Sequence, residues 1–317
     1  MSRLKKSVVF FLVLLVTVSL CACGIGGGGG NPSSKKVVFL SHDSIEGNNI
    51  TGQLFRSVKS KAEAEGYEIE AFNADGNANL QVDQFNDALG KSPLAIILLA
   101  ADGDAVVPSI KKANEMGIPV IATNRDVNGG VFTNVINDEK QGGRLQGEYM
   151  AKHLPQGATV VYLAGDMAIS CAGDRWEGFK EACLDKRPDI QLLAKTATGD
   201  WSEADGIKNM TLWMKMFPKI DAVVAGNDNM VYGAYLALKA NGRADGVLFS
   251  GVDATDNVLK QIEAGTMSQT IMQDLDNVGA AIVEQLKIAS SGQKLQEGNV
   301  LVPLVGITKD NIAKAKH

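Results

Sequence analysis

Short apolar runs alternate along most of the chain with segments in which apolar residues recur at helical spacing. The run 94–100 (LAIILLA) is apolar throughout, as expected for a parallel strand that is buried on both faces. This alternation predicts parallel sheets with helices on both faces, joined by right-handed crossovers. We expect strands at 36–40, 67–72, 94–100, 119–123, 159–163, 190–197, 220–225 and 247–249, and helices at 49–65, 79–89, 106–116, 141–153, 174–185, 203–217, 230–240, 254–264 and 277–290.

The number of these units, together with one interruption, indicates two sheets rather than one. The alternation breaks near 132–138, and a second series of similar units follows it. We therefore predict an α/β protein with two doubly wound parallel-sheet lobes, in which the break is a crossing between them. A length of 317 residues is also typical of about two domains.

The stretch 222–256 contains two polar turns, each directly after a predicted strand. The first turn reads GNDN and contains Asn227, in a sequence suited to a tight turn or a helix N-cap. The second turn reads GVDA and contains Asp253. The carboxyl ends of parallel strands meet at one edge of a sheet, which is where open α/β sheets bind ligands. Asn227 and Asp253 are therefore candidate ligand-binding residues.

The first residues of the chain are predicted to be a targeting segment. Three basic residues precede an apolar run that is too short for a comfortable membrane span. The sequence LCAC at 20–23 resembles a lipobox, so we expect a signal peptide at 1–22, a lipid on Cys23 and a flexible glycine-rich tether at 23–35. The alternative is an ordinary secretory signal cut near Ala22. The mature protein is expected outside the cytoplasm, held at the membrane only by this lipid.

Charge and motif content argue against several classes of function. The leader carries three basic residues and no acidic one, so the net charge of −5 becomes −8 after its removal. An acidic body without a basic patch argues against binding to nucleic acid. The chain contains no G-x-S-x-G, H-E-x-x-H, C-x-x-C or phosphate-loop motif, so we expect neither enzymatic activity nor a cofactor. Cys171 and Cys183 are expected to be free thiols that fill space.

Several further motifs along the chain resemble those of a known family. The chain contains IPVIATNR at 118–125, DRWEGF at 174–179, GDW at 199–201, TIMQD at 270–274 and VPLVGITKDN at 302–311. Together with the two polar turns, these motifs resemble the type I periplasmic sugar-binding proteins, the ribose and glucose/galactose group. The resemblance covers essentially the whole mature chain.

The resemblance implies a division of the chain into two lobes that close on a hinge. The family's three crossings between lobes are expected near Asp138, near 273–274 and near 299–303. The first lobe is then 36–138 plus 274–302, and the second lobe is 139–273 plus 303–317.

The resemblance also implies which side chains bind a sugar. Sugar hydroxyls are recognised by planar groups that donate and accept hydrogen bonds, and the apolar sugar face is recognised by an aromatic ring. The implied residues are Asn124 and Arg125 in the first lobe, and Arg175, Trp201, Asn227, Asp253 and Gln273 in the second lobe and its crossing. We expect Arg125 or Arg175 to pair with Asp253, because a buried charge needs a partner.

Each of these residues also has a purely structural interpretation. An arginine can be an ordinary surface cation, Trp201 can cover a sheet edge, and Asn227 can cap the following helix. His42 and Asn48, which follow the first strand, are additional candidates for the mouth of the site. For His42 a structural role is the alternative.

The chain departs from the family in its first lobe. Ribose and glucose/galactose members have aromatic residues just after the first strand, whereas the matching stretch 48–51 reads NNIT. The ligand is therefore open among hexoses, pentoses and cyclitols. The position of the calcium loop in galactose-binding relatives reads HLPQG at 153–157, without spaced carboxylates, so we expect no metal.

The leading hypothesis is a lipid-anchored, monomeric binding protein that delivers a sugar or polyol to an ABC permease. A second hypothesis is a sensory module that presents the same ligand to a membrane receptor or kinase. A sugar-acting enzyme is a remote third.

Overall fold

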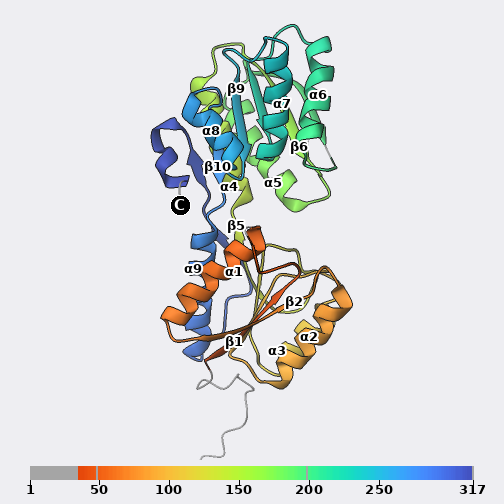
Figure 1. Cartoon of the computed structure of the whole chain (residues 1–317), viewed down its shortest axis with the longest axis vertical. Helices are drawn as coiled ribbons and strands as arrows, with labels where there is room; N and C mark the ends of the chain where they lie inside the picture. The colour runs from red at the N-terminus through yellow and green to blue at the C-terminus, as the bar shows by residue number, and fades with distance from the viewer. Residues whose placement is uncertain (1–34, 48, 198, 316–317) are drawn as a thin grey trace, which may run out of the picture.

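The computed structural model describes residues 35–47, 49–197 and 199–315, and it contains two six-stranded sheets in two lobes (Figure 1). The strand order is β11-β5-β4-β3-β1-β2 in the first sheet and β12-β10-β9-β8-β6-β7 in the second. The two orders match position by position, so the lobes repeat one topology. All pairings are parallel except that of β10 with β12. The predicted fold of two doubly wound lobes is thereby confirmed.

The first lobe, at the bottom of Figure 1, is built mainly from the N-terminal part of the chain. It contains β1 (Lys36–Ser41), α1 (Ile50–Ala64), β2 (Glu68–Asn73), α2 (Ala78–Gly90), β3 (Ala95–Leu98), α3 (Val107–Glu115), β4 (Val120–Thr123), β5 (Thr133–Asn137), α9 (Leu275–Ser290) and β11 (Gly298–Val302). Helices α1 and α9 cover one face of the sheet, and α2 and α3 cover the other.

The second lobe contains α4 (Glu139–His153), β6 (Thr159–Gly165), α5 (Ser170–Phe179), the π-helical turn η1 (Lys180–Leu184), β7 (Gln191–Ala197), α6 (Glu203–Met216), β8 (Ala222–Ala225), α7 (Asp228–Ala240), β9 (Leu248–Val252), α8 (Asp256–Ala264), β10 (Gln269–Met272), β12 (Val305–Ile307) and η2 (Lys309–Ala315). Its sheet lies between one apolar cluster formed with α6, α7 and α8 and another formed with α4, α5 and η1. Every residue of β8 is buried, as its unbroken apolar sequence predicts.

The chain passes between the lobes three times. It leaves the first sheet after β5, returns to the first lobe between β10 and α9, and leaves again between β11 and β12. These crossings lie side by side at the narrow waist of the molecule (Figure 1). Segments far apart in sequence therefore meet at one place, where a small change in backbone angles can reorient whole lobes.

Two local expectations were wrong. The segment 132–138 is not a break, because Thr133–Asn137 forms strand β5 between β4 and β11, and the crossing follows it. The helix expected at 174–185 begins four residues earlier, at Ser170, and continues into η1. Arg175 therefore lies in the second turn of α5, where it is buried, rather than at the helix start.

Glycine permits unusually close packing of α4 against α5. A side-chain carbon at Gly143 would collide with the backbone carbonyl of Arg175. Helix α4 starts directly after the first crossing, so this contact fixes α5 relative to the hinge. None of the described helices is both long enough and apolar enough to span a membrane.

Candidate functional site

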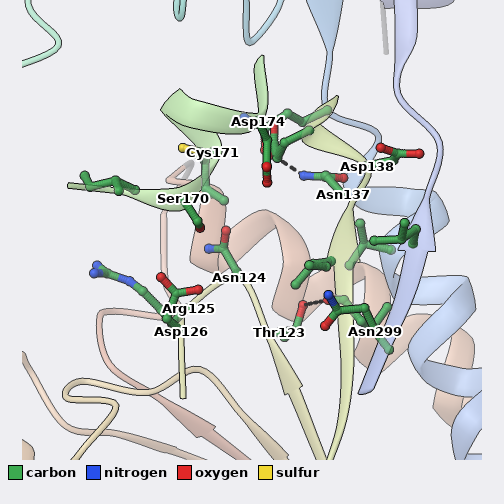
Figure 2. A pocket seen from close by; sticks show the side chains of 18 of the residues that line it. Thr123, Asn124, Arg125, Asp126, Asn137, Asp138, Ser170, Cys171, Asp174 and Asn299 are labelled. Carbon is green, nitrogen blue, oxygen red and sulfur yellow. Dashed lines mark hydrogen bonds between the residues drawn. The ribbon is translucent and has the colours of Figure 1, made fainter. Parts of the chain in front are cut away.

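A cavity of about 680 Å³ lies between the two lobes, at the carboxyl edges of their sheets. This is the position at which ligands bind to open α/β sheets. Figure 2 shows Asn124, Arg125 and Asp126 of the first lobe opposite Ser170, Cys171 and Asp174 of the second. Of the predicted residues, the cavity is lined by Asn124, Arg125, Arg175 and Gln273.

The first-lobe wall is exposed and loosely held. Asn124 and Arg125 follow β4 directly, and both are exposed. Asn124 has a left-handed backbone, with φ of 59°. Within the described part of the chain, neither side chain makes a hydrogen bond or an ion pair. These two polar groups are therefore free to reorient.

Arg175 forms the centre of the second-lobe wall. It is only 4 % exposed, and its Nε donates to Glu139 Oε2 at 2.6 Å. Its Nη1 donates to the carbonyl oxygen of Gly226 at 2.6 Å. Burial lowers the pKa of Arg175, but the adjacent Glu139 carboxylate outweighs this effect, so the net shift is upward. The guanidinium stays charged and fixed in position.

The expected pairing of an arginine with Asp253 is wrong for this structure. Glu139, the first residue of α4, is the partner of Arg175, and the Asp253 Oδ1 instead accepts a hydrogen bond from Gln273 Nε2 at 2.8 Å. Burial raises the pKa of Asp253 to about 6, although Arg175 and the Gln273 hydrogen bond act in the opposite direction.

Gln273 connects Asp253 to the hinge. Its Oε1 accepts a hydrogen bond from Asn137 Nδ2 at 2.8 Å, and Asn137 is the last residue of β5 (Figure 2). The hydrogen-bonded series Asp253–Gln273–Asn137 therefore joins the turn after β9 to two of the three crossings. The Oδ1 of Asn137 is buried and has no hydrogen-bond partner among the described residues.

Trp201 and Asn227 are connected to each other and to helix α7 by hydrogen bonds. The Asn227 Oδ1 caps α7 by accepting the Met230 amide at 3.0 Å, while its Nδ2 donates to the Trp201 carbonyl at 2.9 Å. The Trp201 ring packs against Gly165 and Gly226 at the ends of β6 and β8. It thus covers the sheet edge, and neither it nor Asn227 lines the cavity in this structure.

Left-handed backbone is concentrated at these positions. Among the described residues, six that are not glycine have positive φ, and three of the six are Asn124, Trp201 and Asp253. Such conformations are unfavourable for ordinary residues and tend to occur at functional sites. The strain therefore marks the same turns as the sequence motifs do.

The remaining candidates lie away from the cavity or outside the described residues. His42 is half-buried, and its Nδ1 has no partner among the described residues. Burial and the charge of Arg125 lower the pKa of His42, while Asp43 raises it. His42 does not line the cavity. Asn48, the signal peptide and the lipidation residue Cys23 fall outside the described residues.

Comparison with known proteins identifies the family. The family model for the periplasmic binding protein domain matches residues 44–294. The ribose import binding protein of Salmonella typhimurium is 31 % identical over 254 residues, which cover 78 % of this chain and 84 % of that protein. The chain belongs to the periplasmic binding protein family.

Solved structures agree with this membership. The fold matches that of a periplasmic ribose ABC transporter protein from Conexibacter woesei, with a TM-score of 0.81 and 23 % identity over 91 % of this chain and 96 % of that one. An ABC transporter solute-binding protein from Bacillus halodurans with bound myo-inositol gives a TM-score of 0.71 and 26 % identity over 89 % and 97 % of the two chains. The resemblance to type I periplasmic sugar-binding proteins is confirmed, and membership implies a location outside the cytoplasm.

The cavity of this periplasmic binding protein also contains side chains that sequence reasoning missed. On the first-lobe side, Ile50 and Leu54 line it. The polar additions are Thr123, Asp126, Asn137, Asp138, Glu139, Lys140, Ser170, Cys171, Asp174 and Asn299. Asp126 shares the turn of Arg125 and was open to the same argument. Ser170 and Cys171 lie in the first turn of α5, which begins four residues before the helix expected there.

The described residues contain no group of three or more potential metal ligands that could hold an ion. Both described cysteines are free, as expected, and burial raises the pKa of the Cys171 thiol at the cavity wall. This periplasmic binding protein therefore presents hydrogen-bonding groups, two arginines and an aliphatic surface at its cavity.

Proposed function

We propose that this protein captures a monosaccharide or a cyclitol between its lobes and delivers it to an ABC permease. The observation that carries the proposal is the cavity itself, because Asn124 and Arg125 of one lobe face Arg175 of the other across it. The known relatives support this function, since one is a ribose import binding protein and another contains bound myo-inositol.

The chemistry of the wall suits a ring of hydroxyl groups. Arg175 and Arg125 donate hydrogen bonds to hydroxyl oxygens, and Asp253 accepts hydrogen bonds from hydroxyl protons once the lobes close. Asn124, Asn137 and the other amide side chains do both. Asn137 Oδ1 is an acceptor without a partner in the described chain, which a ligand hydroxyl satisfies on binding.

Binding is coupled to closure of two bodies, 36–138 plus 274–302 and 139–273 plus 303–317. Asp253, Asn227 and Trp201 do not reach the cavity in this structure, so complete contact with a sugar requires the lobes to approach. The ligand stabilises the closed state because it makes contacts there that the open state does not offer. A permease can recognise the closed state as the loaded one.

The protein acts without chemical conversion of its ligand. The one thiol at the cavity wall, Cys171, has a raised pKa, which keeps it in its unreactive protonated form. The Glu139 carboxylate is engaged in an ion pair with Arg175, so Glu139 is poorly suited to act as a base. The proposal therefore describes a carrier rather than an enzyme, and we propose that it acts as a monomer.

The proposed carrier is held at the cell membrane by a lipid on Cys23. Two features support this, the lipobox-like sequence at 20–23 and a family that functions outside the cytoplasm. Changing Cys23→Ser is expected to move the protein from the membrane fraction into the soluble fraction. Membrane association that persists in this variant contradicts the anchor.

A ligand screen tests the proposed function. Thermal unfolding of the mature protein is measured with D-ribose, D-xylose, D-glucose, D-galactose, xylitol and myo-inositol, and each compound that raises the melting temperature is then titrated by calorimetry. A ligand present at 100 times its Kd stabilises the native state by about 2.7 kcal/mol. Fluorescence of Trp201 is expected to change on saturation. If no compound stabilises the protein, the proposal fails.

A further inference from the structure

A fully buried carboxylate, Asp228, lies behind the binding wall and does not line the cavity. It is the first residue of α7, directly after Asn227. Its Oδ1 accepts a hydrogen bond from the Thr270 hydroxyl at 2.7 Å. Its Oδ2 accepts the Thr255 amide at 2.7 Å and the Thr255 hydroxyl at 3.2 Å. Burial raises the pKa of Asp228, and the nearby Asp253 charge raises it further.

Asp228 and Thr270 together hold the strained turn that carries Asp253. Asp253 and Ala254 both have left-handed backbone, with φ of 115° and 52°. Three successive amides of this turn donate to fixed acceptors. Asp253 N–H donates to the Ile271 carbonyl at 2.8 Å, Ala254 N–H to Thr270 Oγ1 at 3.2 Å, and Thr255 N–H to Asp228 Oδ2.

We propose that Asp228 is a positioning residue that fixes the 253–255 turn and so aims the Asp253 carboxylate at the ligand. Without Asp228 the Thr255 amide loses its acceptor and the Thr270 hydroxyl loses its own. The turn then relaxes, since positive φ is unfavourable for Ala254, and the φ of 115° at Asp253 lies outside the narrow range in which aspartate tolerates it. The inference rests on the proposed function for the role of Asp253, and it adds a residue that never touches the ligand.

The local packing is shaped around this carboxylate. A side-chain carbon at Gly251, in β9, would collide with Asp228 Oδ1 and approach Val231. The glycine of the GVDA turn therefore makes room for the aspartate of the GNDN turn. The two motifs, 226–229 and 251–254, are offset by 25 residues in the chain and pack together in space.

The alternative is that Asp228 merely stabilises the lobe, and the chain contains a matched control for that possibility. Asp221 stands just before β8, as Asp228 stands just after it. The Asp221 Oδ2 accepts both the amide and the hydroxyl of a threonine, Thr159, each at 2.9 Å. The hydrogen-bond pattern resembles that of Asp228 Oδ2 with Thr255, but it lies at the opposite edge of the sheet from the cavity.

The experiment compares Asp228→Asn, Asp228→Ala and Thr270→Val with the control Asp221→Asn. Thermal unfolding reports stability, hydrogen exchange reports the order of the 253–255 turn, and calorimetry reports Kd for each compound of the screen above that binds the wild type. Thr270→Val removes one acceptor of the turn without changing side-chain size, so it remains informative if Asp228→Ala does not fold.

We expect all four variants to have a lower melting temperature than the wild type. Only the Asp228 and Thr270 variants should exchange the 253–255 amides faster and bind about tenfold or more weakly, as expected for losing one hydrogen bond to a charged group. Asp221→Asn should keep its Kd within about twofold. The proposal is overturned if the Asp228 and Thr270 variants show the same amide exchange in the turn and the same Kd as the control. It is also overturned if their amides exchange faster but their Kd is unchanged. If the wild type binds no compound, the proposed function fails, while exchange still tests whether Asp228 holds the turn.

Discussion

The two lobes share one strand order but hold their binding residues in opposite ways. In the second lobe Arg175, Asn227 and Asp253 each have side-chain hydrogen bonds to the protein. In the first lobe Asn124 and Arg125 are exposed, and their side chains have no such bond within the described residues. The same fold therefore supplies one rigid half of a site and one adaptable half.

This difference suggests an order of events in binding. A preorganised wall loses little conformational entropy when a ligand arrives, whereas each flexible polar side chain costs about 0.5–1.5 kcal/mol to immobilise. We expect a sugar to dock first on the second lobe. The first lobe then closes over it, with Asn124 and Arg125 adopting whichever rotamers the hydroxyl pattern requires.

The largest expected effect comes from breaking the rigid half at its buried ion pair. Arg175→Met leaves Glu139 buried without its partner and removes the hydrogen bond to Gly226. We expect unfolding free energy, measured in urea, to fall by about 3–5 kcal/mol. The matched variant Arg125→Met changes an exposed cation and should stay within about 0.5 kcal/mol of the wild type while binding more weakly. Equal destabilisation by the two variants contradicts the comparison.

A smaller effect is expected from the protonation of Asp253. Its folded-state pKa of about 6 lies above the unfolded value of about 3.9, so its contribution to unfolding free energy falls as pH rises between these values and is constant above them. The charged groups that face it are Arg175, Glu139 and Asp228, with Gln273 as its hydrogen-bond donor.

Binding should show the opposite dependence on pH, because the ionised carboxylate is the better acceptor for sugar hydroxyls. We expect affinity to weaken by up to about tenfold per pH unit as pH falls below 6. Calorimetry across this range measures it. In Asp253→Asn the affinity should be lower and nearly independent of pH, and a wild-type slope that persists in this variant assigns the titration to another group.

The smallest effect is expected from adding an aromatic face to the adaptable half. Ile50 lines the cavity and is 45 % exposed, in the stretch where the family resemblance implies aromatic residues in other members. Ile50→Phe should tighten binding of a pyranose or cyclitol by about 0.5–1.5 kcal/mol and leave stability unchanged. Leu80→Phe, at a residue 41 % exposed that does not line the cavity, is the control. Weaker binding by Ile50→Phe indicates that the ligand needs the aliphatic surface.

The sequence predicted strands that contain an apolar run, including β7 although it is largely exposed, and missed β5 and β10, although β10 is fully buried. Strand β3 is apolar throughout and was recognisable. Strand β5 reads TNVIN, and its two asparagines interrupt the apolar pattern that identifies a strand. Its strand character comes from β4 and β11 on either side, and β11 lies over 160 residues later in the chain.

The site was predictable to a similar degree. Asn124 and Arg125 were identified from the family resemblance, and they lie directly after β4 at the cavity. The partner of Arg175 was not predictable, because Glu139 stands 36 residues earlier and reaches Arg175 only through the close packing of α4 against α5. Sequence position identifies the turns at a sheet edge, but it does not identify which charges meet there.

The glycine contact between α4 and α5 also sets how this protein can be re-engineered. Because Gly143 admits the backbone of Arg175, and Glu139 at the start of the same helix holds its guanidinium, the two helices form one cassette. Suppose that α5 is replaced by that of a relative with a different ligand while the resident α4 is kept. Both contacts, that of Gly143 and that of Glu139 with position 175, are then mismatched. Exchanging 139–184 as a block preserves them, so recombination between relatives should retain folding when its breakpoints fall outside this segment.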